Sequence, residues 1–568
     1  MSRQGAQGFE LESRWIGGLP LINALLARLG IDALLARVVP APAARTTVPP
    51  AHALGVLLRN IVLCARRPLY TQAEWARRAV PALLGLTPAQ ATALNDDRIG
   101  RALEQLFQAD RAALLTDLVL RAIREFQIEL GQLHNDSTTI TFTGAYAAAE
   151  GRTVHGQPTV HITYGHNKDH RPDLKQLLFV LTVAADGAVP IHYRALDGNT
   201  NDAPTHIQTW ETLCTLAGRR DFLYVADSKL CAEESLTHIA QHQGRFITVL
   251  PRTRREDRWF RELLQTHQLP WEEVLRRPNP RRRAGREDVW KVVEAPLPSK
   301  EGYRVIWVWN SLMAAQDAEA RQARIERAWA GMQRLTTKLE GPRCRIRTRE
   351  RVEALATRIV ATAARWVAYA IHEHTEPHFR QESRGRPGHT TRYLRGERVR
   401  FSIALTTRPE VIEADARCDG LFPLITNCPE LSKKQILEAY KYQPRLEKRL
   451  EQLKTVEAVT PVFLKRVSRI EALLFLYFIA LLVQALLERE VRRAMARETI
   501  DRLPLYPEER ECRAPSTERI LDLFASLQRH RLWQQGHLVQ VFDPELTELQ
   551  RTILRLLGIS PAVFTATA

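Results

Sequence analysis

The chain has 568 residues, of which 45% are hydrophobic, and 81 Lys and Arg against 64 Asp and Glu give it a formal net charge of +17. This length excludes a single hydrophobic core, and the apolar content supports several folded units. The excess of cations favours a polyanionic partner, because Lys and Arg gain affinity by displacing counterions from phosphates, although a merely soluble basic protein has the same composition.

Residues 1–128 are predicted to form an all-α domain. Apolar residues recur there at the helical spacing of about 3.6, and the periodic segments are separated by turns that contain Pro and Gly. DNA binding, pairing of two copies and simple packing all remain open for this domain. The stretch MSRQGAQGFELESRW lacks the basic start and apolar core of a secretory signal, and the seven cysteines show no CxxC spacing. We therefore expect a reducing, cytoplasmic location.

The pattern changes to strands at residue 129. LHNDSTTITF, QLLFVLTVAADGAVPIHYRAL and DFLYVADSK are rich in apolar and β-branched residues, and Asp186-Gly187 between two apolar runs predicts a hairpin. Helical segments separate the later strands, so 129–254 should be the first part of an α/β core with a mixed sheet. Six histidines between residues 155 and 206 match no paired metal-ligand spacing, which favours polar strand faces and loops.

Basic, Trp-containing sequence follows residue 254. A charged helical pattern then runs from about Ala314 to His372, and strand-like sequence returns at VRFSIALTT and CDGLFPLIT. We interpret 255–398 as a β-rich then helical insertion within the core. Its Arg-rich stretch, which includes Arg384 and Arg386, is a candidate clamp for the DNA backbone, and a solvated loop is an equal alternative.

The core should resume over 399–500, and a C-terminal helical region should occupy 501–568. The most apolar segment lies in the resumed core, where 12 uninterrupted apolar residues run from Ala472 to Val483. This is short of the roughly 20 residues that cross a bilayer. We therefore predict a buried core helix and no membrane partner.

Three acidic residues are candidates for catalysis. Asp136 and Asp227 lie on runs that predict buried strands, and Glu447 lies on a charged helical pattern. Carboxylates brought together from such segments are suitable ligands for two Mg2+ ions roughly 3.5 to 4 Å apart, which run phosphoryl transfer on nucleic acid. The alternatives are turn or capping roles for the aspartates and an ordinary exposed glutamate, with Glu451 as a rival third ligand.

The helical segment around the third acid has its own spacing. Tyr440, Glu447 and Lys454 recur every seven residues, so they share a face if the helix is continuous. Proline is best tolerated in a first helical turn, and so Pro444 favours a break in which one helix ends near Gln443 and another begins at Pro444. In that case only the residues after the break, which are Glu447, Glu451 and Lys454, share one face of the helix.

These segments resemble a known family. LHNDSTTITFTGAY, VADSKL and YKYQPRLEKRLEQLK are similar to the acid-bearing segments of the DDE transposases of bacterial insertion sequences, and further stretches extend the resemblance from about residue 20 to about residue 560. The most similar branch has a β-rich insertion between its second and third acids and a Tyr-Arg-Glu-Lys signature. Tyr440, Glu447 and Lys454 match this signature, and Gln443 replaces its arginine.

The resemblance implies a ribonuclease H-like mixed-sheet catalytic core in which Asp136, Asp227 and Glu447 bind two Mg2+ ions, for which Mn2+ can substitute. It also implies cleavage and strand transfer at the inverted-repeat ends of an insertion sequence, by cut-and-paste with a hairpin intermediate. The DNA contacts implied are Tyr440, Lys454 and Gln443, in a homodimer on paired ends that binds terminal repeats and target DNA at the bacterial nucleoid. A DNA-binding regulator that does not cut and a nuclease without strand transfer are the alternatives.

Overall fold

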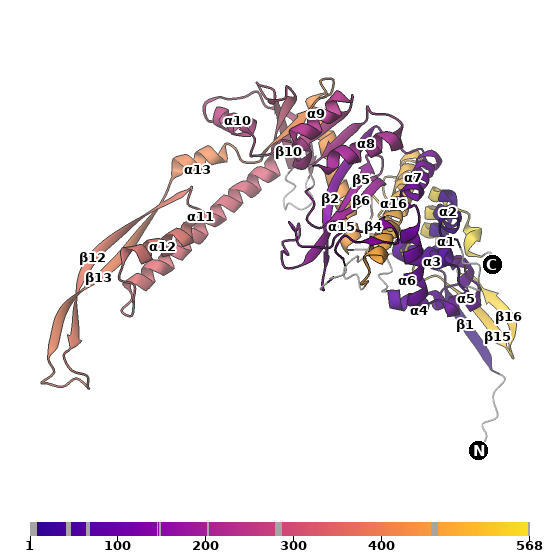
Figure 1. Ribbon diagram of the computed structural model, residues 1–568, viewed down its shortest axis with the longest axis horizontal. Coiled ribbons are helices and arrows are strands. Elements are labelled where there is room, and N and C mark those ends of the chain that lie inside the picture. The colour runs from indigo at the N-terminus through magenta and orange to yellow at the C-terminus, as the bar shows by residue number, and fades with distance from the viewer. Residues whose placement is uncertain are drawn as a thin grey trace, which may run out of the picture. The chain divides into compact units, whose positions relative to one another are not determined.

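The computed structural model describes residues 8–40, 47–63, 69–144, 146, 149–201, 204–278, 287–455 and 464–565. The chain divides into two compact units (Figure 1), the first comprising Met1–Thr248 with Glu438–Ala568 and the second comprising Val249–Leu437. Both units combine helices with strands, so the predicted α/β class is confirmed.

The first unit is built on a mixed sheet with the strand order β6-β5-β2-β7-β8. Its strands are β2 (Gln132–Phe142), β5 (Lys175–Ala184), β6 (Val189–Asp197), β7 (Leu223–Ala226) and β8 (Arg245–Val249). β2, β5 and β6 are antiparallel, whereas β7 runs parallel to β2 and β8 runs parallel to β7. Asp186 and Gly187 connect β5 to β6 as predicted, and Gly187 has the positive φ of 83° that this turn requires.

Helices pack on this sheet within the first unit. α8 (Thr205–Ala217) and α9 (Glu233–Gln241) precede and follow β7 in sequence. α16 (Val467–Arg497) packs against β6 and against helices of the N-terminal region, which places the apolar segment of the sequence in the core as predicted. The N-terminal helices are α1 (Leu19–Leu29), α2 (Ile31–Val38), α3 (Pro50–Val62), α4 (Gln72–Arg78), α5 (Pro88–Ala93), α6 (Asp96–Gln108) and α7 (Arg111–Phe126).

By length and composition, α16 is the one helix within the described residues that could cross a membrane, and its apolar window is entirely buried in the protein. The pair α1 and α2, bent by 61°, passes the same test only if it is counted as one span. A helix that is apolar on all its faces can be buried entirely in the core of a protein. An uninterrupted apolar run therefore needs no bilayer to be buried.

The two ends of the chain correct the expectation of all-helical terminal regions. β1 (Phe9–Trp15) pairs antiparallel with β15 (Gln528–Gln534), which pairs with β16 (His537–Phe542). The partner of β1 lies more than 500 residues away along the chain, so no local hairpin signal marks it. The C-terminal region also contains α17 (Thr517–Asp522) and α18 (Glu548–Leu557).

Four strands of the second unit follow one another in a sheet in the order β14-β11-β10-β9. They are β9 (Glu272–Pro278), β10 (Glu287–Glu294), β11 (Arg304–Asn310) and β14 (Leu421–Thr426), and α10 (Arg255–Thr266) precedes them. Between β11 and β14 lie α11 (Ser311–Glu340), α12 (Arg349–Val360), a long hairpin of β12 (Val367–Gln381) and β13 (Tyr393–Thr407), and α13 (Pro409–Ala416).

This unit differs from the predicted insertion in two ways. The helical pattern expected to reach His372 ends at Val360, and β12 follows it. The segment VRFSIALTT belongs to β13, which pairs with β12 instead of resuming the sheet, so the boundary predicted at residue 398 falls inside a strand. The hairpin and the two helices enclose a separate apolar core that includes Leu339, Val352 and Phe401.

Candidate active site

Asp136 lies on β2, and Asp227 comes directly after the neighbouring strand β7. β2 and β7 run parallel, and Asn135 lies opposite Ala226. The residue that follows Asn135 is Asp136, and the residue that follows Ala226 is Asp227. Asp227 also accepts a hydrogen bond from the backbone N–H of Lys229 (3.1 Å) and so caps the short helix after β7. The capping alternative is therefore realised, and it holds this carboxylate beside the end of the strand.

Glu447 comes to the same region on a helix that begins after a break. α14 (Lys433–Tyr440) ends three residues before α15 (Gln443–Thr455), and Pro444 lies in the first turn of α15, as predicted. α15 packs against β2 and β5, and Glu447 is exposed. Glu447 and Lys454 therefore share one helix, while Tyr440 lies at the end of the preceding one.

Electrostatics show that the three acids converge. The pKa of Asp136 is raised to about 6, first by burial and also by the negative charges of Asp227 and Glu447, while the charge of Lys168 lowers it. The Asp136 side chain retains 18% exposure. Burial also raises the pKa of Tyr440 to about 12, and the charges of all three acids contribute. Tyr440 therefore borders the acidic cluster and keeps its phenol proton at neutral pH.

The residues present fit divalent cations. Three carboxylates supply hard oxygen ligands, and their mutual repulsion is the kind of charge accumulation that a bound cation relieves. In the described part of the chain, their ligand atoms do not all lie within 4.8 Å of one another. Ligands shared between two ions roughly 3.5 to 4 Å apart can be spaced more widely than the ligands of a single ion.

Lys168 lies beside Asp136, although no pattern in the sequence singled it out. Its Nζ donates to the backbone oxygen (2.6 Å) and the Oγ (2.7 Å) of Ser137 and lies 3.7 Å from Asp136 Oδ1. Lys454 lies near the same loop, because its Nζ forms an ion pair with Asp169 (2.8 Å). Two lysines thus lie close to the acids, where a polyanion would meet them.

The placement of Gln443 corrects the expectation that it contacts DNA. Its side chain is buried, with 4% exposure. Oε1 accepts a hydrogen bond from His134 Nδ1 (2.8 Å), and Nε2 donates to the backbone oxygen of Asn135 (3.1 Å). Gln443 therefore joins α15 to β2 immediately before Asp136, and both ends of its amide are hydrogen-bonded within the protein.

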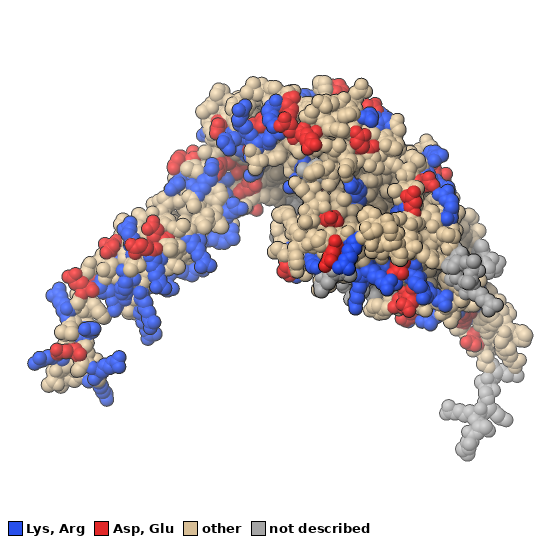
Figure 2. Space-filling view, in the orientation of Figure 1, with Lys and Arg blue, Asp and Glu red and all other residues tan. Residues whose placement is uncertain are grey.

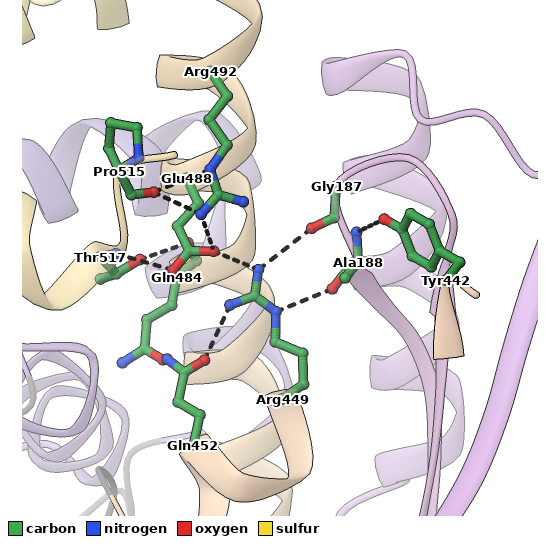
Figure 3. Close-up of polar contacts among 10 residues, drawn as sticks. All are labelled: Gly187, Ala188, Tyr442, Arg449, Gln452, Gln484, Glu488, Arg492, Pro515 and Thr517. Carbon is green, nitrogen blue, oxygen red and sulfur yellow. Dashed lines mark hydrogen bonds and ion pairs between the residues drawn. The ribbon is translucent and has the colours of Figure 1, made fainter. Parts of the chain in front are cut away.

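Arg449 provides a second attachment for α15 (Figure 3). Its guanidinium forms a buried ion pair with Glu488 of α16 (2.8 Å) and donates to the backbone oxygens of Gly187 and Ala188 in the β5–β6 turn (3.3 and 3.2 Å). Tyr442 accepts a hydrogen bond from the backbone N–H of Ala188 (2.7 Å). The helix that carries Glu447 is thus joined both to the central helix and to the sheet, which fixes its position over Asp136.

Two buried histidines predict how stability depends on pH. Burial lowers the pKa of His134 and of His192 to about 4, from an ordinary value of 6.5. The unfolded chain binds their protons first, so the stability that they contribute is complete above pH 6.5 and is lost as the pH falls toward 4, with about 2 kcal/mol for each histidine lost by pH 5. Urea unfolding at pH 7 and pH 5 should show a smaller loss in His192→Leu than in the wild type. Equal losses would contradict the expectation, and exposed His155→Gln is the control.

The predicted arginine clamp lies in the second unit. Arg384 and Arg386 are exposed in the loop between β12 and β13. Figure 2 shows Lys and Arg side chains gathered over this hairpin and its two helices. Arg400, in contrast, is buried and donates to the backbone oxygens of Leu339 and Gly341 (3.0 and 2.8 Å). The arginines at the hairpin end therefore differ from Arg400, which ties the hairpin to the end of α11.

Comparisons with known proteins give limited information. A domain of unknown function, DUF4277, matches residues 11–120. No curated protein matches the chain. Among solved structures, the cryo-EM structure of the piggyBac transposase synaptic complex with hairpin DNA is similar over 97% of this chain and 85% of that chain, at 10% sequence identity and a TM-score of 0.39. A likeness at this level sets no constraint on the activity of this chain.

Proposed function

We propose that this protein is a DDE-type DNA transposase that cleaves and joins DNA strands in a metal-dependent reaction. The observation that carries the proposal is the convergence of Asp136, Asp227 and Glu447, in which the charges of the other two acids raise the pKa of Asp136. The net charge of +17 supports a DNA substrate, and the resemblance of the acid-bearing segments to DDE transposases supports the reaction.

The acids would hold two Mg2+ ions, or Mn2+ in their place. When bound, such ions activate an attacking oxygen and stabilise the leaving one. Asp136, which feels the charges of both other acids, would supply ligand oxygens to the site. Tyr440 keeps its proton and can donate a hydrogen bond to a phosphate oxygen. Lys168 and Lys454 place positive charge where it can attract the phosphates of the DNA strand.

The finer features rest on the resemblance. We propose a ribonuclease H-like core of the bacterial insertion-sequence branch and a cut-and-paste reaction at terminal inverted repeats with a hairpin intermediate. A homodimer would hold paired ends at the nucleoid in the cytoplasm. Arg384 and Arg386 would contact the DNA backbone from the hairpin of the second unit, where both side chains are exposed.

The proposal is tested with DNA that carries the inverted repeats flanking the reading frame. In the presence of Mg2+, we expect cleavage at the repeat ends followed by joining to a target, and no reaction when EDTA removes the metal. Cleavage without joining would instead identify a nuclease, and binding without cleavage would identify a regulator. Scrambled repeats of the same length and charge serve as the control for sequence-independent binding.

The third ligand is tested by two matched variants. Glu447→Gln should lower the rate of cleavage by at least about tenfold, because it removes a charge that contributes to the cluster around Asp136. Glu451→Gln, one turn further along the exposed face of α15, should leave the rate within about twofold. The measurement is a single-turnover cleavage assay on end-labelled repeat DNA. A larger effect of Glu451→Gln would make Glu451 the third ligand.

A further inference from the structure

A second cluster of metal-ligating side chains lies on the helices that flank β7. It consists of Glu211 on α8, His238 on α9 and His242 immediately after α9. One ligand atom from each residue lies within 4.8 Å of the other two. Two imidazole nitrogens and a carboxylate are therefore gathered closely enough to share one ion.

The two histidines are oriented for this purpose. They are four residues apart, one helical turn, and their ring centroids are 4.3 Å apart. His242 Nδ1 lies 2.8 Å from the backbone oxygen of His238. A carbonyl only accepts, so Nδ1 must carry the proton, which leaves the lone pair on Nε2. Histidines that bind metals are oriented by this kind of hydrogen bond on their other nitrogen.

The surroundings hold the other two ligands in place. His238 Nε2 lies 2.8 Å from Glu211 Oε1, and the rings of His238 and the buried Trp210 meet edge to face, with centroids 5.9 Å apart and an interplanar angle of 88°. Arg220 lies 3.8 Å from Glu211 Oε2. The arginine therefore approaches one carboxylate oxygen and the histidine the other, so Oε1 already points toward the imidazoles.

We propose that Glu211, His238 and His242 bind a transition metal ion such as Zn2+. Imidazole nitrogens suit zinc and are poor ligands for Mg2+, and a set of three protein ligands leaves a fourth position on the exposed side of His242 for water. The ion would replace the direct contact between His238 and Glu211. It would link α8 to α9 and so help to hold β7 in place. β7 is the strand that ends directly before Asp227. This site goes beyond the proposed strand transfer and does not depend on it.

Zinc titration of the full-length protein tests the proposal. The protein is prepared without a polyhistidine tag, stripped of metal and freed of chelator, and it carries Asp136→Ala so that the acidic cluster does not contribute a second site. We expect one bound Zn2+ per chain by isothermal titration calorimetry. In the same background, His242→Gln and Glu211→Gln should each weaken binding by at least about tenfold. Exposed His155→Gln should leave the affinity unchanged.

A second readout guards against variants that fail to fold. Zn2+ should raise the midpoint of thermal unfolding in the Asp136→Ala protein and leave it unchanged in Asp136→Ala/His242→Gln, because only binding to the folded state shifts the midpoint. His242 is exposed, so its replacement leaves the core intact. Equal zinc affinity with and without His242, or no zinc binding by the folded protein, would overturn the proposal.

Discussion

Replacing Arg449 with Met should lower the free energy of unfolding by about 3 kcal/mol, because the buried Glu488 carboxylate loses its nearer cation and keeps the more exposed Arg492 (3.2 Å). Arg449 and Glu488 have side-chain exposures of only 6% and 9%. The same change removes the hydrogen bonds from α15 to the β5–β6 turn. Urea unfolding measures the loss. Cleavage should also fall under conditions in which the variant remains folded, because Glu447 lies on the released helix.

Two further variants separate this pair from general effects on α15. Arg445→Met changes an exposed arginine that lies over the Tyr442 ring (4.6 Å), and it should change stability by less than about 1 kcal/mol. The double variant Arg449→Met/Glu488→Met should recover part of the lost stability, because it removes the buried carboxylate together with Arg449, and the partly exposed Arg492 is solvated more easily. If the loss of stability in the double variant equals the sum of the losses in the two single variants, the interaction between Arg449 and Glu488 contributes nothing to stability.

Features with local signals were predictable from the sequence. Asp186 and Gly187 marked the β5–β6 turn because a tight turn needs a residue that tolerates positive φ. Pro444 marked the break before α15 because proline lacks the backbone N–H that a helix interior uses. Asp136 and Asp227 were placed on neighbouring strands by their apolar, β-branched flanks, and the parallel pairing of β2 with β7 agrees.

Features that depend on distant partners were not predictable. Gln443 was expected to contact DNA because it occupies the arginine position of the Tyr-Arg-Glu-Lys signature. Its burial depends on His134 and Asn135, which lie about 300 residues earlier in the chain. Lys168 lies in a loop without periodicity, and only the fold brings it to Asp136. The pair His238 and His242 did carry a signal, since an interval of four places two histidines on one helix face, but Glu211 joins them only through packing.

Replacing Asp136 with Asn should stabilise the metal-free protein and abolish its activity. The pKa of Asp136 is raised to about 6 in the folded chain, so its stability contribution is complete below about pH 3.8 and is lost as the pH rises through 6. At pH 8 the ionised carboxylate therefore destabilises the fold, and Asn should raise the free energy of unfolding by up to about 3 kcal/mol, a figure that follows from the raised pKa and already includes the attraction to Lys168. Cleavage should fall about a thousandfold or more, which corresponds to about 4 kcal/mol in the barrier.

The pH and metal dependence of this variant distinguish a functional cluster from ordinary surface acids. The gain in stability should be present at pH 8 and absent near pH 4, where the wild-type carboxyl is already protonated. Mg2+ should stabilise the wild type more than Asp136→Asn, because the cation relieves the repulsion that the substitution has already removed. Asp173→Asn, which changes an exposed acid paired with Arg171, should alter neither stability nor cleavage appreciably. An Asp136→Asn protein that is less stable and still cleaves DNA would show that this carboxylate stabilises the fold and does not bind a catalytic metal. A metal ligand that is repelled by two neighbouring acids should instead give a more stable and inactive variant.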